Sequence, residues 1–391
     1  MKIIHLFANW KWTGPAEPAL STAALQSEQH DVLFASGAGK DDQDSKILPH
    51  ARARGVNTVE GFHLSKHARV AANREDVRRL VGLLREFEPD IVHTHLDNDH
   101  RIASLAMRET GIGLLVRTAY DAEGLSGGFR SRRLARRRLD GLIVTTEHGR
   151  EFTLETYGGA ERSVSISGRP RPMVLIEPGI DLGRFDPSRF DRAAARRELG
   201  LEPEHVAVSI VARVQTHRRF DLLLDAVEQL RNMHPEFRLV VAGRGTNIER
   251  LLLKPVKERG LEDAVITPGY LEGDAYPRLL AAIDASVFLV PGSDGTCRAL
   301  REQMAMGLPP LVTPRAPLPE IIEEGTAGFV VQETSDDLVR GIGRLITEPG
   351  LRARLGEGAA AVARARFDAR LQAEKATLFY EQLLESASSS S

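Results

Sequence analysis

Two carboxylates, Asp294 and Glu302, are the residues whose type and spacing are most informative for chemistry. They follow a short apolar run, Ala285–Val290, and a glycine-containing turn that leads into an expected helix start. A strand, turn and helix start in this order point backbone N–H groups and a helix dipole at one place, which suits a phosphate. Carboxylates beside such a site suit the hydroxyls of a ribose and a sugar. The segment predicts a nucleotide-sugar pocket, with Gly295, Thr296, Cys297 and Arg298 as further donor-binding residues.

A structural role for the same residues is the alternative. Asp294 would then cap the helix, a position at which aspartate is favoured. Arg298 stands four residues before Glu302, a spacing that allows an ion pair on a solvated helix face. We favour the pocket because the order of strand, turn and helix matches the chemistry.

Two arginines, Arg213 and Arg218, are candidates for binding a diphosphate. They follow an apolar run over 205–212 and precede an expected helix. Arginine stays charged and forms bidentate contacts with phosphate, although both residues could equally lie on the surface.

Three glycines that follow expected strands have two interpretations. Gly243 and Gly245, after the next strand, would let the backbone approach a phosphate or would only form a packing turn. Gly14, after the first strand, has the same two interpretations.

A polar run near the end of another expected strand suggests acid–base or acceptor-binding groups. It contains His93, His95, Asp97, Asn98, Asp99 and His100. A single histidine on a strand is more often structural, but so polar a run at a strand end favours a site. A metal is not expected, because no second cluster of ligands supports one.

An arginine-rich stretch, Arg130–Arg138, carries six arginines in nine residues. It would face anionic phospholipid, bind a phosphorylated acceptor, or form a solvated helix face. Nucleic acid is not expected, because the stretch lacks interleaved aromatic residues.

The elements that must position these residues alternate between short apolar runs and amphipathic helices, which is typical of parallel sheets with crossover helices. A helix is expected over Phe220–Leu230 and a last helix over Arg370–Glu385. The expected strands are Lys2–Phe7, His30–Ala35, Val56–Glu60, Ile91–His95, Gly113–Thr118, Gly141–Thr145, Met173–Glu177, His205–Ala212, Phe237–Ala242, Ala264–Thr267, Ala285–Val290, Pro310–Thr313 and Gly328–Val331.

Length and composition fit two globular α/β domains. The chain has 391 residues, 42% hydrophobic and 27% charged residues, and a net charge of −2. We expect domains over 1–181 and 182–368, and a helix with a Ser-rich tail over 369–391 that returns towards the first domain. The one cysteine excludes a disulfide within the chain, and no apolar run is long enough to span a bilayer. The expected location is cytoplasmic, with peripheral contact at the inner face of the membrane as an option.

Taken together, these segments resemble the retaining GT-B glycosyltransferases of the large family that includes sucrose synthase and many bacterial lipopolysaccharide and capsule enzymes. Pro178–Pro187 resembles the interdomain segment of that family. Arg213 and Arg218 match its Arg…Lys pair that holds the donor diphosphate, and Gly243 and Gly245 match its Val-Gly-x-Gly. The resemblance implies two doubly wound Rossmann-like domains that face each other across a cleft.

The sequence also departs from the family pattern. Asp294 stands where glutamate is usual, Arg218 replaces lysine, and Arg219 replaces the following glycine. Tyr120 stands where a histidine often contacts the sugar, which leaves His95 as the better candidate in the first domain. The resemblance assigns the ribose to Glu302 and the donor sugar to Asp294.

The expected function is sugar transfer from a nucleoside diphosphate donor, UDP- or GDP-linked, with retention and without a metal or other cofactor. Arg213, Arg218, Asp294 and His95 are the expected catalytic residues. The acceptor, a glycan, a glycolipid or a small molecule, would contact Asp97, His100 and Tyr120. The alternatives are a nucleotide-sugar epimerase of the same fold and a non-catalytic sugar-nucleotide-binding protein. An NAD oxidoreductase is disfavoured because no full Gly-x-Gly-x-x-Gly is present.

Overall fold

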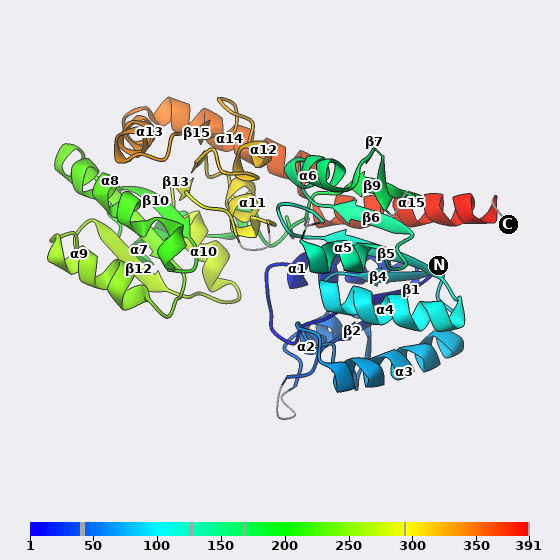
Figure 1. Cartoon of the computed structure of the whole chain (residues 1–391). Helices are drawn as coiled ribbons and strands as arrows, with labels where there is room; N and C mark the ends of the chain where they lie inside the picture. The colour runs from blue at the N-terminus through cyan, green and yellow to red at the C-terminus, as the bar shows by residue number, and fades with distance from the viewer. Residues whose placement is uncertain (40–43, 126–127, 161, 167–168, 293–294, 390–391) are drawn as a thin grey trace. The chain divides into compact units, whose positions relative to one another are not determined.

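A computed structural model of the chain describes residues 1–39, 44–125, 128–160, 162–166, 169–292 and 295–389. Internal contacts divide the chain into two compact units (Figure 1). The first comprises Met1–Gly179, Gly292–Thr296 and Ala369–Ser391, and the second comprises Ile180–Pro291 and Cys297–Asp368. Each unit is an α/β layer structure around its own parallel sheet.

The first unit is built on a nine-stranded sheet in the order β3-β2-β1-β4-β5-β6-β9-β8-β7. The strands are parallel up to β9, and β7, β8 and β9 then pair antiparallel. The central strands are buried on both faces, as the crossover helices of a parallel sheet require. Their bounds are β1 Lys2–Phe7, β2 Asp31–Ser36, β3 Asn57–Val59, β4 Ile91–Thr94, β5 Leu114–Ala119, β6 Gly141–Val144, β7 Gly159–Ala160, β8 Ser163–Ile166 and β9 Arg169–Leu175.

Helices cover both faces of this sheet. Successive residues of β1 point to opposite faces, so Ile3 packs in the core beneath α1 and α15 while Ile4 packs in the core beneath α3 and α4. The helix α15, although last in the chain, supplies Phe379 and Tyr380 to the first of these cores. The helices are α1 Ala16–Gln26, α2 Leu48–Ala53, α3 Val70–Phe87, α4 Asp97–Thr110, α5 Phe129–Ala135, α6 Glu147–Tyr157 and α15 Ala369–Ser388.

The second unit has a six-stranded, fully parallel sheet in the order β12-β11-β10-β13-β14-β15. Its strands are β10 Val206–Val211, β11 Phe237–Ala242, β12 Val265–Gly269, β13 Ala285–Phe288, β14 Pro310–Val312 and β15 Phe329–Val330. Its α-helices are α7 Arg192–Glu198, α8 Phe220–Met233, α9 Lys254–Glu258, α10 Ala275–Ala281, α11 Arg298–Ala305, α12 Leu318–Ile321, α13 Ser335–Thr347 and α14 Pro349–Arg366.

The strand order reverses direction at the same place in both sheets. The chain runs from β1 outward to β3 and then returns to β4 on the other side of β1, and β10 and β13 repeat this arrangement. Ligands of such sheets bind outside the carboxyl ends of the strands at the reversal. The topology therefore directs attention to the loops after β1 and β4 and after β10 and β13.

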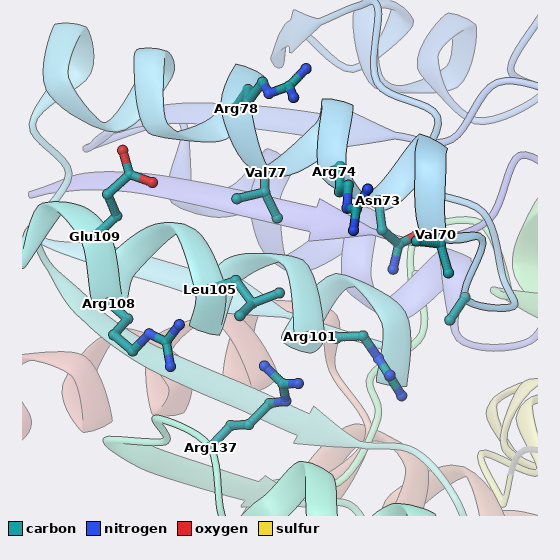
Figure 2. A pocket seen from close by; sticks show the side chains of 11 residues that line it. Val70, Asn73, Arg74, Val77, Arg78, Arg101, Leu105, Arg108, Glu109 and Arg137 are labelled. Carbon is teal, nitrogen blue, oxygen red and sulfur yellow. The ribbon is translucent and has the colours of Figure 1, made fainter.

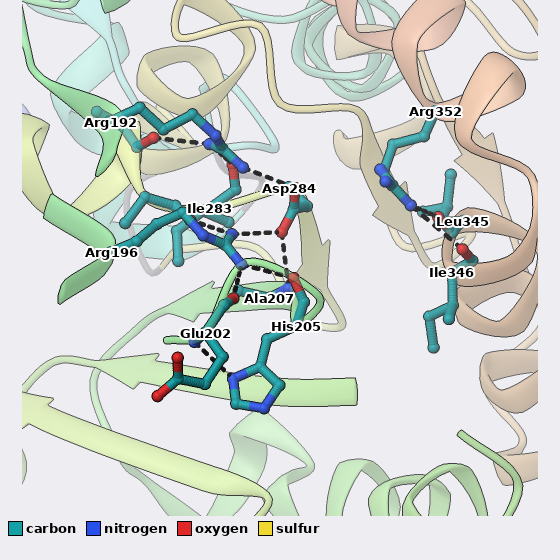
Figure 3. Close-up of polar contacts among 12 residues, drawn as sticks. Arg192, Arg196, Glu202, His205, Ala207, Ile283, Asp284, Leu345, Ile346 and Arg352 are labelled. Carbon is teal, nitrogen blue, oxygen red and sulfur yellow. Dashed lines mark hydrogen bonds and ion pairs between the residues drawn. The ribbon is translucent and has the colours of Figure 1, made fainter. Parts of the chain in front are cut away.

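The opposite, amino-terminal end of the second sheet is held by a charge network centred on the largely buried Asp284 (Figure 3). Asp284, just before β13, accepts hydrogen bonds from Arg192, Arg196 and the backbone N–H of Ala207 in β10. Arg196 also donates to the carbonyls of Glu202 and others nearby, so α7 is held to the strand ends. The network therefore anchors the second sheet at the end opposite the candidate site.

The α/β fold class and the parallel sheets predicted from the sequence are confirmed. The expected helices correspond to α8 and α15. The hairpin strands β7 and β8 were not predicted, because short edge strands carry little hydrophobic alternation. Among the described residues, no helix has both the length and the apolar character needed to cross a bilayer.

Candidate active site

Arg218 lies at the strand-order reversal of the second unit. It stands in the short turn between β10 and α8, and its Nη1 donates to the carbonyl oxygens of Val290 at 2.7 Å and Pro291 at 2.8 Å. These carbonyls follow β13, so the side chain joins the carboxyl ends of the two strands that flank the reversal. Arg213, directly after β10, is exposed and has no ion pair within the described part of the chain. Both predicted cations are therefore at the position that the topology assigns to a ligand.

The two glycines after β11 allow close approach between neighbouring loops. A Cβ on Gly243 would lie 2.0 Å from the carbonyl oxygen of Ala212, and one on Gly245 would lie 2.2 Å from that of Val214. The Val214 N–H in turn donates to the Arg244 carbonyl at 3.1 Å. These glycines pack the loop after β11 against the loop that carries Arg213, which is the packing role that the sequence analysis gave as the alternative.

Glu302 lies on α11 and is buried, with 4% of the residue exposed. Its Oε1 is 3.0 Å from Nε of Arg298, one turn earlier on the same helix. The pairing that the sequence suggested is thus confirmed, but the solvated face suggested with it is wrong. Burial, and then the charge of the nearby Glu302, raise the pKa of Tyr276 well above its ordinary value. A buried carboxylate held by an arginine is a suitable acceptor for ligand hydroxyls.

The helix α11 is fixed against the sheet by polar as well as apolar contacts. Gln303 accepts a hydrogen bond of 2.6 Å from Ser209 of β10, and both side chains are fully buried. The guanidinium of Arg301 lies 4.2 Å from the ring centroid of Phe367. The orientation of Glu302 is therefore set by neighbours on both sides of it in the sequence.

The residues before α11 have unusual backbone geometry. Gly295 has a φ of 65°, and Cys297, the residue before α11, has a φ of 45°. A Cβ on Gly295 would lie 2.5 Å from the backbone nitrogen of Ala122, so this position requires glycine on two grounds. Thr296 is buried, and Gly292–Thr296 groups with the first unit rather than the second. Asp294, the predicted sugar-binding carboxylate, lies outside the residues that the structure describes.

The first unit contains a buried hydrogen-bonded chain at its own strand-order reversal. His5 of β1 bonds Gln26 at 2.9 Å and His95, just after β4, at 3.0 Å, and His95 then approaches the Tyr120 hydroxyl at 3.3 Å. His93, beside His5 in the sheet, bonds Thr118 and the Tyr380 hydroxyl of α15. Of this network, His93, His95 and Tyr120 were singled out from the sequence. His5 and Tyr380 were not, because neither stands in a polar run.

Burial controls the ionisation of this network. It lowers the pKa of His5 to about 4, and it lowers the pKa values of His93 and His95 well below their ordinary value, with help from neighbouring histidine charges. The three rings are therefore neutral at pH 7. Their ring nitrogens lie close enough together to hold a metal ion, but in the structure all six already have hydrogen-bond partners.

The structure separates the predicted first-unit residues into accessible and buried groups. Asp97 leaves 61% of its side chain exposed and pairs with Arg117, whose charge lowers the Asp97 pKa. His100 is fully buried between Arg117 and the Arg138 carbonyl, so its position gives an acceptor no access. His95 is also buried, and its Nδ1 approaches the hydroxyl of Tyr120, itself 4% exposed. Gly14 lies in the loop between β1 and α1.

Asp99 is a residue whose role the sequence left unspecified. Its carboxylate accepts hydrogen bonds from the backbone N–H groups of Ala8 at 2.9 Å, Leu96 at 2.8 Å and His100 at 2.7 Å. Burial raises the pKa of Asp99 to about 7 in spite of these bonds. Asp99 therefore ties the loop after β1 to the start of α4, a positioning role beside the reversal.

Family models match both halves of the chain. Residues 22–184 match Glycosyltransferase Family 4, and residues 191–362 match Glycosyl transferases group 1. The chain is a GT-B protein of this glycosyltransferase type. The predicted GT-B fold is thus confirmed, and the sites above occupy the strand-order reversals of its two Rossmann-like units.

Similar sequences and structures extend along most of this GT-B chain. It is 26% identical over 302 residues to a D-inositol 3-phosphate glycosyltransferase of Actinosynnema mirum, covering 73% of this chain and 72% of the relative. A Salinispora arenicola protein of the same name is 28% identical, and the match spans 64% of its length. The Anabaena protein HepE, solved with UDP and glucose, superposes with a TM-score of 0.79 at 19% identity, covering 97% of this chain and 99% of that one. A Rickettsia africae glycosyltransferase gives 0.82 at 16% identity, with 98% of each chain covered.

Proposed function

We propose that the protein transfers a sugar from a nucleoside diphosphate donor to an acceptor hydroxyl, with retention of the anomeric configuration. The observation that carries the proposal is the position of Arg218, which is hydrogen-bonded to the carbonyls after β13. It stands five residues after Arg213, which is exposed and has no ion pair among the described residues. The strand-order reversal is where this fold binds ligands, and two cations there suit a diphosphate.

In the proposed reaction, Arg213 and Arg218 stabilise the negative charge that develops on the leaving diphosphate. Electrostatic groups fixed in advance are commonly the largest contribution to catalysis of this kind. The buried Glu302 binds the ribose hydroxyls, and Asp294 binds the donor sugar. In the first unit, Asp97 and Tyr120 contact the acceptor, and the hydrogen-bonded chain from Gln26 through His5 and His95 holds the Tyr120 hydroxyl in place.

The donor is proposed to be a UDP-sugar. HepE from Anabaena has been solved in complex with UDP-glucose, which supports uridine as the base on grounds of shared fold. Retention is proposed from the family resemblance alone. The curated relatives named D-inositol 3-phosphate glycosyltransferase support a polyhydroxylated acceptor, and a glycan or glycolipid acceptor fits the resemblance to envelope enzymes.

A panel of nucleotides tests the donor site directly. UDP, GDP, ADP and CDP are compared by thermal shift, and we expect UDP to raise the melting temperature most. The rise should be measurable, because a ligand at about 100 times its dissociation constant stabilises the folded state by about 2.7 kcal/mol. No shift with any nucleotide would refute the proposed donor site.

Turnover separates the remaining alternatives. The protein is incubated with the selected UDP-sugar, with and without acceptor, and the products are analysed by NMR, which also reports the anomeric configuration. We expect glycosylated acceptor with the donor's configuration. A new sugar nucleotide formed without acceptor would indicate an epimerase, and binding without any turnover would indicate a non-catalytic protein.

A further inference from the structure

The first unit carries a long basic hollow that takes no part in the proposed reaction. One section, of about 670 Å³, runs between α3 and α4 over the apolar side chains of Val77 and Leu105. A second section, of about 590 Å³, continues towards the residues that follow α5. The two sections share Leu105, Arg108 and Arg137 in their linings, so they form one continuous surface.

Eight arginines line this surface. One of them, Arg138, pairs with Asp140, and the other seven have no carboxylate partner within ion-pair distance among the described residues. We refer to them as the basic surface. The carboxylate in the lining, Glu109, already pairs with Arg85 at 3.6 Å. The whole chain has a net charge of −2, so this concentration of positive charge is local. The seven are Arg74, Arg78, Arg101, Arg108, Arg133, Arg136 and Arg137.

The arginines of the basic surface repel one another. Figure 2 shows Arg137 reaching towards α4, with Arg101 and Arg108 on either side. Burial, and then the charges of Arg101, Arg133 and Arg108, lower the pKa of Arg137. Unpaired cations held this close would be stabilised by an external anion.

Apolar side chains accompany the charges. Val70, the first residue of α3 and part of the lining, is 73% exposed, and Phe129, the first residue of α5, is 81% exposed. Exposed apolar side chains of this size next to arginines are typical of surfaces that lie at a membrane interface.

We propose that the basic surface docks the protein on an anionic phospholipid bilayer. The cations come from α3, from α4 and from the segment around α5, so they are spread along an extended surface rather than gathered around one phosphate. A bilayer offers many phosphates over a similar extent, and it also accepts Val70 and Phe129. The sequence pointed only to Arg130–Arg138, whereas the structure adds four arginines from α3 and α4. Membrane docking does not depend on the proposed transferase activity.

Vesicle co-sedimentation of the full chain tests this proposal. The wild type is mixed with phosphatidylcholine vesicles that contain or lack phosphatidylglycerol, at low and at physiological salt. The variant R74Q/R108Q/R136Q removes one exposed arginine from each of the three segments. The matched control R197Q/R354Q/R364Q removes three exposed arginines of the second unit that have no ion pair in the described residues.

We expect binding that requires phosphatidylglycerol and weakens with salt. Each arginine near an anionic surface contributes roughly fivefold, so the first variant should bind on the order of a hundredfold more weakly while the control binds as the wild type does. Circular dichroism and melting temperature should match for all three proteins.

Three outcomes would overturn the proposal. The first is equal binding to neutral and anionic vesicles. The second is an equal loss of vesicle binding in R74Q/R108Q/R136Q and in the control variant, and the third is no binding to anionic vesicles at low salt. Parallel titrations with inorganic phosphate and with a single-stranded oligonucleotide identify the other occupants. Saturable binding of either one by the basic surface, without vesicle binding, would assign the surface to that ligand instead.

Discussion

Nε of Arg298 lies 3.0 Å from Oε1 of Glu302, one helical turn away, and only 6% of the Glu302 side chain is exposed. The pair holds a carboxylate inside the second unit, close to the start of α11. We predict that Glu302→Gln weakens donor binding about tenfold to a hundredfold, because hydrogen bonds to a charged group contribute about 1.5–3 kcal/mol. Isothermal titration with UDP measures the loss. Glu262→Gln, at an exposed position of the same unit, is the control, and equal affinities for the two variants would contradict the ribose role.

Arg213 should matter for the reaction and not for folding. It is exposed and has no ion pair within the described residues, so its replacement breaks no ion pair there. We predict that Arg213→Gln lowers kcat by about 10²–10³, the loss found on removal of one donor to a developing anion, with little change in melting temperature. Arg197→Gln serves as control. A kcat within twofold of the wild type would remove Arg213 from the mechanism.

Arg219 occupies a left-handed backbone position, with φ 57° and ψ 39°, between the turn that carries Arg218 and α8. Its guanidinium pairs with Glu333 at 2.8 Å. Arg219→Ala and Arg219→Gly both remove this pair, but only glycine relieves the backbone strain, which costs about 1–2 kcal/mol. We predict that the glycine variant is the more stable of the two by about 1 kcal/mol in urea unfolding. An alanine variant of equal or greater stability would refute the strain argument.

Acid should destabilise the first unit through its buried histidines. The pKa of His5 falls from 6.5 to about 4 on folding, that of His100 to about 3, and those of His93 and His95 also fall. Below pH 6.5 the unfolded chain therefore binds more protons, and stability decreases as the pH falls from 6.5 towards 4. Asp99 acts in the opposite direction, because its raised pKa lets the folded state bind a proton below about pH 7.

The net effect can be measured between pH 7.5 and 5.5. As the pH falls over this interval, each of the four buried histidines lowers the free energy of unfolding by about 1 kcal/mol, and Asp99 raises it by about 2 kcal/mol. We therefore expect a net decrease of roughly 2–3 kcal/mol. Urea unfolding should show a shallower pH dependence for His5→Gln and a steeper one for Asp99→Asn. His67→Gln, at an exposed position, should leave the slope unchanged. A wild-type stability that is flat across this range would contradict the assigned ionisation states.

The network around Asp284 predicts a large difference between two neighbouring arginines. Arg196 leaves 10% of its side chain exposed and Arg192 leaves 47% exposed, although both donate to the same carboxylate. Removing one partner of a buried pair costs about 3–5 kcal/mol, whereas an exposed pair contributes about 0–1 kcal/mol. We predict that Arg196→Met lowers the free energy of unfolding by several kcal/mol and that Arg192→Met has a small effect. Equal losses in the two variants would contradict this assignment.

The parallel sheets could be predicted from the sequence because their strands are continuous apolar runs bounded by turns. The run Ala285–Val290 and the strand β13 show this correspondence. The two arginines could be predicted because their position after β10 places them at the carboxyl edge of the sheet. The hydrogen bonds of His5 with His95 and of Tyr380 with His93 could not be predicted. They join residues that are far apart in the sequence, through the register of β1 with β4 and the packing of α15.

Burial explains the remaining differences between sequence and structure. His95 and His100 stand in a polar run that suggested access to a ligand, yet both rings are enclosed and hydrogen-bonded. Glu302 shows the opposite case, because the alternative interpretation placed it on a solvated helix face whereas the structure buries it. The sequence gives the types of these residues but not the neighbours that cover them, so their exposure could be determined only from the structure.

The helix α15 has a consequence for how the protein is made. Phe379, Tyr380 and Leu383 belong to the core of a sheet whose strands all end by Leu175. During synthesis, the first unit must leave the ribosome with part of one face of its sheet uncovered. The whole second unit must be translated before α15 closes that part of the face. An apolar surface exposed for this period is a natural substrate for chaperones.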